Sequence, residues 1–178
     1  MFLQCEMVYW EAQVPGRLPL AFGVARGKED STMNPEDVHD AMCKMGFMHG
    51  LPGELKDKVS RILQNISELR RVPLGMTWLR EGEHSKNKGY ILLEGAVSIR
   101  KADSLGHTEN APELLGEIMQ FNPQHMRTAT VVATEDCVVM RFNWDEFWTR
   151  AEESLSESEI EKVKAALEGF AWEHFSRQ

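Results

Sequence analysis

The sequence predicts a mainly β domain with flanking helices: a jelly-roll β-roll (a double-stranded β-helix) with N-terminal helices and C-terminal helices. Two observations favour this fold class. Between residues 71 and 143, short segments rich in β-branched and aromatic residues alternate with glycine or polar turns, which is typical of a sandwich or roll. On both sides of that region, apolar residues recur at spacings of three and four, which indicates amphipathic helices.

The chain of 178 residues is long enough for one domain with a substantial core and some additional sequence. Residues 1–10 are apolar enough to pack as a short strand or an irregular arm. Residues 11–33 are punctuated by proline and glycine and are predicted to be an extended linker. We therefore expect four parts: an N-terminal arm and linker (1–33), N-terminal helices (34–70), the β-roll (71–143) and C-terminal helices (144–178).

Asn34 and Pro35, followed by two acidic residues, predict the start of a helix. Asparagine suits the N-cap, proline suits the first helical position, and acidic side chains interact favourably with the positive end of the helix dipole. We expect this helix to end near Gly46. A second, amphipathic helix is predicted from Pro52 to about Leu69, because apolar residues recur there at helical spacing.

The C-terminal helices are predicted from two capping-box patterns, one at Asn143 and Glu146 and the other at Ser156 and Glu159. The last helix has a narrow apolar stripe, which suits either docking on the β-roll or pairing with a second copy of the chain. The residues of this stripe are Ile160, Val163, Leu167, Phe170 and His174.

Within the β-roll, turn residues separate the predicted strands. The segment 102–113 is polar and is predicted to be a loop. The strands are expected at 76–80, 90–93, 96–100, 128–133 and 138–143.

The segment from Gly116 to Val131 combines features that suit a nucleotide. Gly116 permits a sharp turn, and the free N–H groups of a short helix beginning near Glu117 can point at an anion. Arg127 can return to the same place, where its planar guanidinium suits two phosphate oxygens. Because Glu117 can accept hydrogen bonds from sugar hydroxyls, the two side chains are suited to a ribose and a phosphate.

This segment resembles the phosphate-binding cassette of the cyclic nucleotide-binding domain, as found in catabolite activator proteins and protein kinase A regulatory subunits. The blocks 75–83 and 89–99 are similar to the paired strands and glycine turns that precede the cassette in that family. The resemblance covers roughly residues 52 to 176. It implies that Glu117 holds the ribose 2′-hydroxyl and Arg127 the cyclic phosphate. The implied ligand-binding residues are Gly116, Glu117, Ile118, Met119, Arg127, Thr128 and Ala129.

Three further residues bear on the ligand. The hydroxyl of Thr128 can reach a phosphate or a guanine amino group, which does not decide between cAMP and cGMP. Trp172 or Phe175 on the last helix can stack on a purine, or can be a buried or dimer-facing aromatic residue.

The resemblance implies a regulatory module that binds cAMP or cGMP and signals through helix rearrangement to an unidentified protein partner. A homodimer through the C-terminal helix is also expected, as in activator-type relatives. The alternative is a degenerate β-roll without nucleotide, acting as a protein-interaction or dimerisation scaffold. Two departures from the family pattern support this alternative: Met119 replaces a small residue, and residues 112–115 replace the usual Gly-Asp-x-Phe that leads into the cassette.

Composition excludes several other classes. The net charge of −8 argues against a general nucleic-acid-binding surface. No apolar run reaches membrane-spanning length, so no membrane partner is expected. Cys5, Cys43 and Cys137 have no metal-like spacing and form no complete disulfide framework, which favours a reducing, cytoplasmic setting.

We expect no catalytic residues, no metal and no cofactor, and therefore not an enzyme. The histidines form no His-x-His pair and no ligand cluster recognisable from their spacing. Met42, Met45 and Met48, with Cys43 and His49, can suggest a soft-metal site or a methionine-rich packing face. Packing is favoured, because this spacing lacks a closed ligand set.

Overall fold

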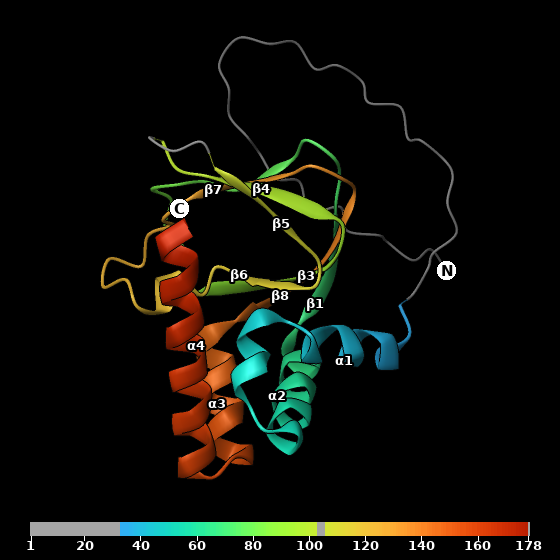
Figure 1. Ribbon diagram of the computed structural model, residues 1–178, viewed down its shortest axis with the longest axis vertical. Helices are drawn as coiled ribbons and strands as arrows, with labels where there is room; N and C mark the ends of the chain where they lie inside the picture. Colours follow the sequence, from blue (N-terminus) through green and yellow to red (C-terminus); the bar gives the residue numbers. More distant parts are fainter. Residues whose placement is uncertain (1–32, 103–105, 178) are drawn as a thin grey trace, which may run out of the picture. The chain divides into compact units, whose positions relative to one another are not determined.

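The computed structural model describes residues 33–102 and 106–177 (Figure 1). Of the arm and linker expected at residues 1–33, residues 1–32 lie outside the described residues. In the described part of the chain, no helix is both long and apolar enough to cross a membrane.

Two four-stranded antiparallel sheets form the β-roll, which confirms the predicted fold class. One sheet has the order β1-β8-β3-β6 and the other the order β2-β7-β4-β5. The first sheet consists of β1 (Glu68–Val72), β3 (Lys88–Glu94), β6 (Glu113–Leu115) and β8 (Cys137–Asn143). The second sheet consists of β2 (Thr77–Leu79), β4 (Ala96–Arg100), β5 (His107–Asn110) and β7 (Thr130–Ala133).

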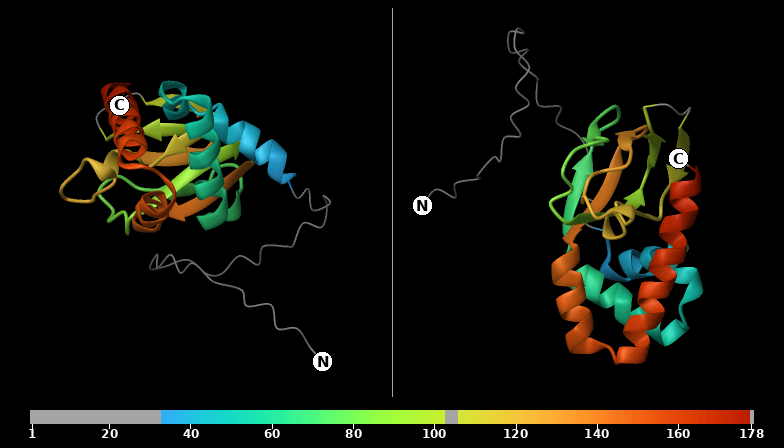
Figure 2. Two further views of the ribbon diagram at one scale, coloured as in Figure 1. Left: turned by 90° about the horizontal axis from the view of Figure 1, so that it is seen from below. Right: turned by 90° about the vertical axis from the view of Figure 1, so that its left-hand side faces the viewer.

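The helices lie on the outer side of the first sheet (Figures 1 and 2). The α-helices are α1 (Pro35–Cys43), α2 (Gly53–Ile66), α3 (Trp144–Ser154) and α4 (Glu157–Arg177). Two short 3-10 helices are η1 (Gly46–Gly50), in the helical layer, and η2 (Ile118–Gln120), in the cassette.

The two central strands of the first sheet, β3 and β8, bury side chains on both faces, since successive side chains of a strand point in opposite directions. In β3, Leu92 lies in the core between the two sheets, whereas Ile91 and Leu93 lie in the core shared with the helices. In β8, Val139 and Met140 divide in the same way. Strands β3 and β8 therefore contribute side chains to both cores, and they connect the interior of the β-roll with the helical layer.

The start of α1 is confirmed, since Asn34 caps the helix by accepting a hydrogen bond from the Glu36 N–H at 3.3 Å. The predicted end of the second helix is wrong. Helix α2 ends at Ile66, Ser67 is extended, and Leu69 belongs to β1, where it is 47 % exposed. Strand β1 pairs along its length with β8. Leu69 continues the helical spacing of the apolar residues in α2, but backbone pairing with β8 makes its segment a strand.

The prediction of a loop over residues 102–113 is also wrong. Most of β5 is polar, yet it pairs with β4 from Ala96–Asn110 to Ile99–His107. Strand β6 begins at Glu113 and pairs with β3. Both strands lie at sheet edges, where the backbone pairing of one neighbour is sufficient and an alternating apolar pattern is not required.

Helix α4 docks on its own domain through the predicted stripe. Val163, Leu167 and Phe170 are buried in the core beside the helices. The Ser156–Glu159 capping box is confirmed: the Ser156 N–H donates to the Glu159 carboxylate at 2.8 Å, and the Glu159 N–H donates to the Ser156 hydroxyl at 3.4 Å. A homodimer through α4 stays a prediction, and it requires a different face of the helix.

Candidate ligand-binding site

All of the predicted ligand-binding residues line one cavity of about 40 Å³ between the β-roll and α4. They come from the turn after β6, from helix η2, and from the segment leading into β7. Their role in ligand binding stays a prediction. These residues are Gly116, Glu117, Ile118, Met119, Arg127, Thr128 and Ala129.

The turn at Gly116 is sharp, as expected, and its φ of +83° is in a region that favours glycine. Helix η2 follows directly and makes the single helical turn expected near Glu117. A Cβ atom at Gly116 would collide with Nη1 of Arg127. The absence of a side chain at Gly116 therefore permits both the sharp turn and the close packing of the Arg127 guanidinium.

Arg127 is buried, with 7 % of its surface exposed. Its Nη2 donates hydrogen bonds to the carbonyl oxygens of Lys88 at 2.7 Å and Ser85 at 3.3 Å. Its Nη1 has no hydrogen-bond partner among the described residues. Burial lowers the pKa of the guanidinium, and the neighbouring Tyr90 opposes that shift. A buried guanidinium with a free donor is well suited to an anion, because an unpaired buried donor is costly.

Glu117 is 2 % exposed, and its carboxylate accepts a hydrogen bond at 2.9 Å from Nδ1 of His174 on α4. His174 is also buried, and Phe170 packs against its ring. The Glu117–His174 pair therefore connects the cassette directly to the last helix.

The environment of His174 favours the charged imidazolium. Burial lowers the pKa of His174, but the hydrogen bond to Glu117 and the charges of Glu117, Glu113 and Glu109 outweigh burial. The pKa therefore lies above its ordinary value. For Glu113 the main effect is burial, which raises the pKa of that carboxyl. The cassette thus meets α4 through a group of acidic side chains around one histidine.

Met119 is buried and lines the cavity, and its side chain belongs to the core shared with the helices. The longer side chain that replaces the family's small residue therefore points inward, not into solvent. Its thioether occupies apolar space beneath η2.

A second, larger pocket of about 310 Å³ adjoins the cavity and shares Ile118 and Thr128 with it. Its wall on α4 includes Trp172, which is 58 % exposed, and Phe175. Phe121 of the cassette lies opposite in the same pocket. Trp172 and Phe175 are therefore not buried core residues, and both line this pocket.

The sequence analysis placed His174 in the apolar stripe but did not connect it with Glu117. A histidine on the buried face of an amphipathic helix is a usable signal, because a buried polar side chain needs a partner. The Ser85 and Lys88 carbonyls were also missed. Backbone acceptors leave no trace in the residue types, so only the structure could reveal them.

The structure is thus a β-roll of two antiparallel sheets with helices on one side and a buried carboxylate and guanidinium at a common cavity. Residues 69–154 match the family model described as the cyclic nucleotide-binding domain. By this match in sequence and by its fold, this part of the chain is similar to the cyclic nucleotide-binding domain.

Solved structures agree on the fold. The sensor domain of the transcriptional regulator DNR from Pseudomonas aeruginosa is 18 % identical, with a TM-score of 0.57, and the match covers 76 % of this chain and 91 % of that one. The structure described as Sp-2Cl-cAMPS bound to PKAR CBD2 is 19 % identical, with a TM-score of 0.55, and the match covers 76 % and 90 % of the two chains.

A curated relative is the Pycsar effector protein XpPycTIR of Xanthomonas perforans. It is 24 % identical over 105 residues, which are 59 % of this chain and 34 % of the relative. The matched region thus spans about a third of the length of that effector protein.

Proposed function

We propose that this chain is a regulatory module that binds a cyclic nucleotide, cAMP or cGMP, at the cavity beneath α4. The observation that carries the proposal is that Glu117 and Arg127 are both buried at one cavity, with Nη1 of Arg127 free of hydrogen-bond partners within the described residues. A carboxylate suits sugar hydroxyls, and a guanidinium suits a phosphate diester.

Binding requires an exchange of partners in the cassette. The cavity of about 40 Å³ is far smaller than the roughly 300–1,000 Å³ typical of small-molecule sites. Glu117 is engaged by His174, and one nitrogen of Arg127 is engaged by two carbonyl oxygens. A nucleotide must therefore replace His174 at Glu117, which displaces the end of α4.

This exchange is the proposed source of the signal. A ligand shifts a conformational equilibrium only by its difference in affinity for the two states. Here the ribose and His174 compete for one carboxylate, so nucleotide binding and the docked position of α4 oppose each other.

We propose that the output passes from α4 to a protein partner, with homodimerisation through the exposed face of that helix as one form of it. The match to part of an effector protein supports a sensing role for this domain. No catalytic residue is proposed within the chain.

The test is calorimetric titration and thermal unfolding of the full chain with each of the four common 3′,5′-cyclic nucleotides, and with 5′-AMP and 5′-GMP as non-cyclic controls. A nucleotide at about 100 times its dissociation constant stabilises the folded state by roughly 2.7 kcal/mol, which raises the Tm by several degrees. We expect cAMP or cGMP to do so and the controls not to. If no cyclic nucleotide binds, the domain is a nucleotide-free scaffold and the proposal is wrong.

A further inference from the structure

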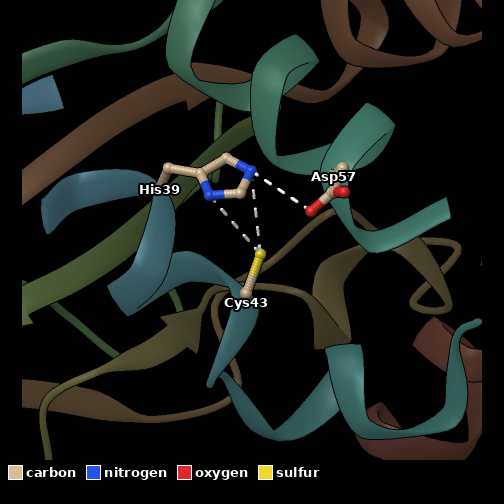
Figure 3. Close-up of side chains that lie close together, drawn as sticks. All are labelled: His39, Cys43 and Asp57. Carbon is tan, nitrogen blue, oxygen red and sulfur yellow. Dashed lines mark hydrogen bonds and ion pairs between the residues drawn. The ribbon is translucent and has the colours of Figure 1, made fainter. Parts of the chain in front are cut away.

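A second constellation of polar side chains lies between α1 and α2, and none of its residues lines the cavity (Figure 3). His39 and Cys43 are one helical turn apart on α1, and Asp57 comes from α2. Nε2 of His39 lies 3.5 Å from Oδ1 of Asp57 and 3.9 Å from Sγ of Cys43. Three different donor atoms thus converge from two helices.

We propose that His39, Cys43 and Asp57 bind a divalent transition-metal ion of the zinc type, with water in the fourth position. Imidazole nitrogen, thiolate sulfur and carboxylate oxygen are the ligand types that zinc takes in proteins, and tetrahedral geometry is its usual choice. Tetrahedral bonds of about 2.0–2.3 Å place the donor atoms roughly 3.3–3.6 Å apart. The donor atoms here lie within 4.8 Å of one another, so small rotamer changes complete the site.

The spacing within α1 alone does not explain the arrangement. Residues four apart on a helix are always neighbours, so the pairing of His39 and Cys43 is expected in any helix. The additional observation is Asp57, which reaches the same ring nitrogen from another helix and is 59 % exposed. The three donor atoms, from two helices, lie within 4.8 Å of one another, and this convergence is the observation on which the proposal rests.

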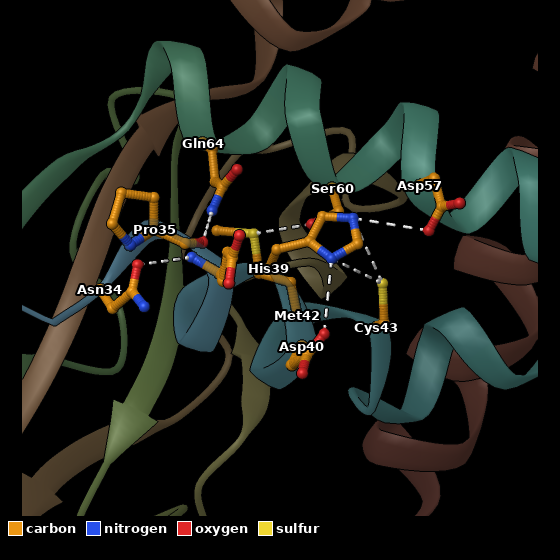
Figure 4. Close-up of polar contacts among 10 residues, drawn as sticks. Asn34, Pro35, His39, Asp40, Met42, Cys43, Asp57, Ser60 and Gln64 are labelled. Atoms are coloured by element: carbon orange, nitrogen blue, oxygen red, sulfur yellow. Dashed lines mark hydrogen bonds and ion pairs between the residues drawn. The ribbon is translucent and has the colours of Figure 1, made fainter.

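The two helices hold the site in a defined geometry (Figure 4). At the start of α1, the side-chain amide of Gln64 on α2 donates to the Pro35 carbonyl at 2.7 Å. Further along, the Ser60 hydroxyl of α2 donates to the Met42 sulfur at 3.5 Å, and both residues are fully buried. The donor residues therefore lie on rigid, packed elements, as a selective site needs.

A second carboxylate, that of Asp40, lies near the other ring nitrogen of His39. This nitrogen, Nδ1, lies 3.7 Å from Oδ1 of Asp40 (Figure 4). This separation is longer than a hydrogen bond, and Sγ of Cys43 is nearly equidistant from the two ring nitrogens, at 4.0 Å from Nδ1 and 3.9 Å from Nε2. We assign Nε2 to the ion because it is the nitrogen that faces Asp57, and Asp40 is the carboxylate in reach of Nδ1 once the ring binds metal.

The site differs from the methionine-rich soft-metal site that the sequence suggests. Met42, Met45 and Met48 are fully buried in the apolar core, which confirms the prediction of packing, and His49 is exposed. A mixed nitrogen, sulfur and oxygen set favours zinc over the reduced copper that thioethers select. The proposed consequence is structural, since the ion joins α1 to α2.

The experiment is titration of the full chain, purified under reducing conditions and freed of metal with a chelator, with Zn²⁺ and with Co²⁺. We expect one Zn²⁺ per chain and a rise in Tm. The Co²⁺ form should show the thiolate-to-metal charge-transfer absorption and the intense visible bands of a tetrahedral site. Since even an outer partner is worth about 10–100-fold in metal affinity, Cys43→Ser, His39→Gln and Asp57→Asn should each weaken Zn²⁺ binding by ~100-fold or more.

Matched controls on the same chain are Cys5→Ser, His49→Gln and Asp37→Asn, which should bind Zn²⁺ as the parent does. Asp40→Asn should weaken binding by about 10–100-fold and keep the charge-transfer band. Asp57 is exposed, so Asp57→Asn tests the site without disturbing the core. Absence of stoichiometric Zn²⁺, equal losses in the control variants, or a Co²⁺ spectrum without the thiolate band overturns the proposal.

Discussion

Arg127 combines a contact within the fold with a donor facing the cavity, so its removal should have two separate effects. Arg127→Ala removes hydrogen bonds to two carbonyl oxygens, which should lower the free energy of unfolding by about 1–3 kcal/mol. It also removes the proposed phosphate contact. A hydrogen bond to a charged group contributes about 1.5–3 kcal/mol, so nucleotide affinity should fall roughly ten- to hundredfold. Denaturant unfolding and calorimetric titration measure the two effects.

Arg80→Ala is the matched control, since Arg80 is exposed and makes only a surface ion pair with Glu83 at 3.7 Å. Arg80→Ala should leave nucleotide affinity unchanged and should lower the free energy of unfolding by no more than the small contribution of a surface ion pair. If Arg127→Ala binds nucleotide as the parent does, Arg127 is purely structural and the proposed phosphate contact is wrong.

His174 should limit nucleotide affinity, because it occupies the carboxylate that the ribose needs. In His174→Gln the amide still donates to Glu117 but carries no charge, so the docked arrangement should lose roughly 1–3 kcal/mol. We expect a lower Tm without nucleotide and an affinity higher by about tenfold or more. Glu173→Gln, an exposed neighbour on the same helix, is the control and should leave both unchanged. Weaker binding by His174→Gln would show that His174 assists the ligand.

The raised pKa of His174 predicts a pH dependence with a definite sign. The folded protein holds a proton on His174 more tightly than the unfolded chain does, so the stabilisation is complete below about pH 6.5 and is lost as the pH rises through the folded-state pKa. Glu113, whose pKa is also raised, contributes in the same direction at lower pH. Because nucleotide binding frees His174, affinity should increase with pH over that window. His174→Gln should flatten the increase in a series of titrations.

At the scale of elements, the turn before η2 should tolerate no side chain. Gly116→Ala combines a positive φ, which costs an L-residue about 1–2 kcal/mol, with a collision against Arg127. Gly82→Ala has a similar φ of +77° and nothing within 4 Å of the new Cβ. We therefore expect both variants to lose stability, and only Gly116→Ala to lose nucleotide affinity as well. Equal nucleotide affinity in the two variants would contradict the proposed packing of Gly116 on Arg127.

The strands show how far residue patterns predict elements. Strand β4 was predicted with its observed bounds, because Val97 and Ile99 alternate with more polar residues and both point into the core between the sheets. Strand β1 was missed, since only Val72 is buried in it and its charged residues resemble a helix surface. Strand β5 was missed for a similar reason. Edge strands are stabilised by backbone pairing, which the residue types do not report.

At the scale of the whole molecule, nucleotide binding should loosen the end of α4 and leave the rest of the domain unchanged. Breaking the Glu117–His174 pair removes the polar contact between the cassette and that helix. We expect faster amide hydrogen exchange over residues 170–177 with saturating nucleotide, and unchanged exchange in β3 and β8, which form the centre of the first sheet. Uniform slowing across α4 would contradict the proposed displacement.

The sequence by itself determined the β-roll with flanking helices, the glycine turn, the short helix after it and the approach of Arg127 to that turn. These follow from local chemistry: turn residues, strand propensity, capping and the spacing of apolar residues. It also placed all of the proposed ligand-binding residues around one cavity, because the cassette is a single short segment.

Only the tertiary structure decided which partners those residues have. Glu117 and His174 are separated by 57 residues, and Cys43 meets Asp57 from another helix. Helical periodicity predicts that His174 faces the core, but the register in which α4 docks determines which carboxylate it meets. Such contacts depend on the packing of whole elements, and they determine how the cassette opens and whether a metal ion joins α1 to α2.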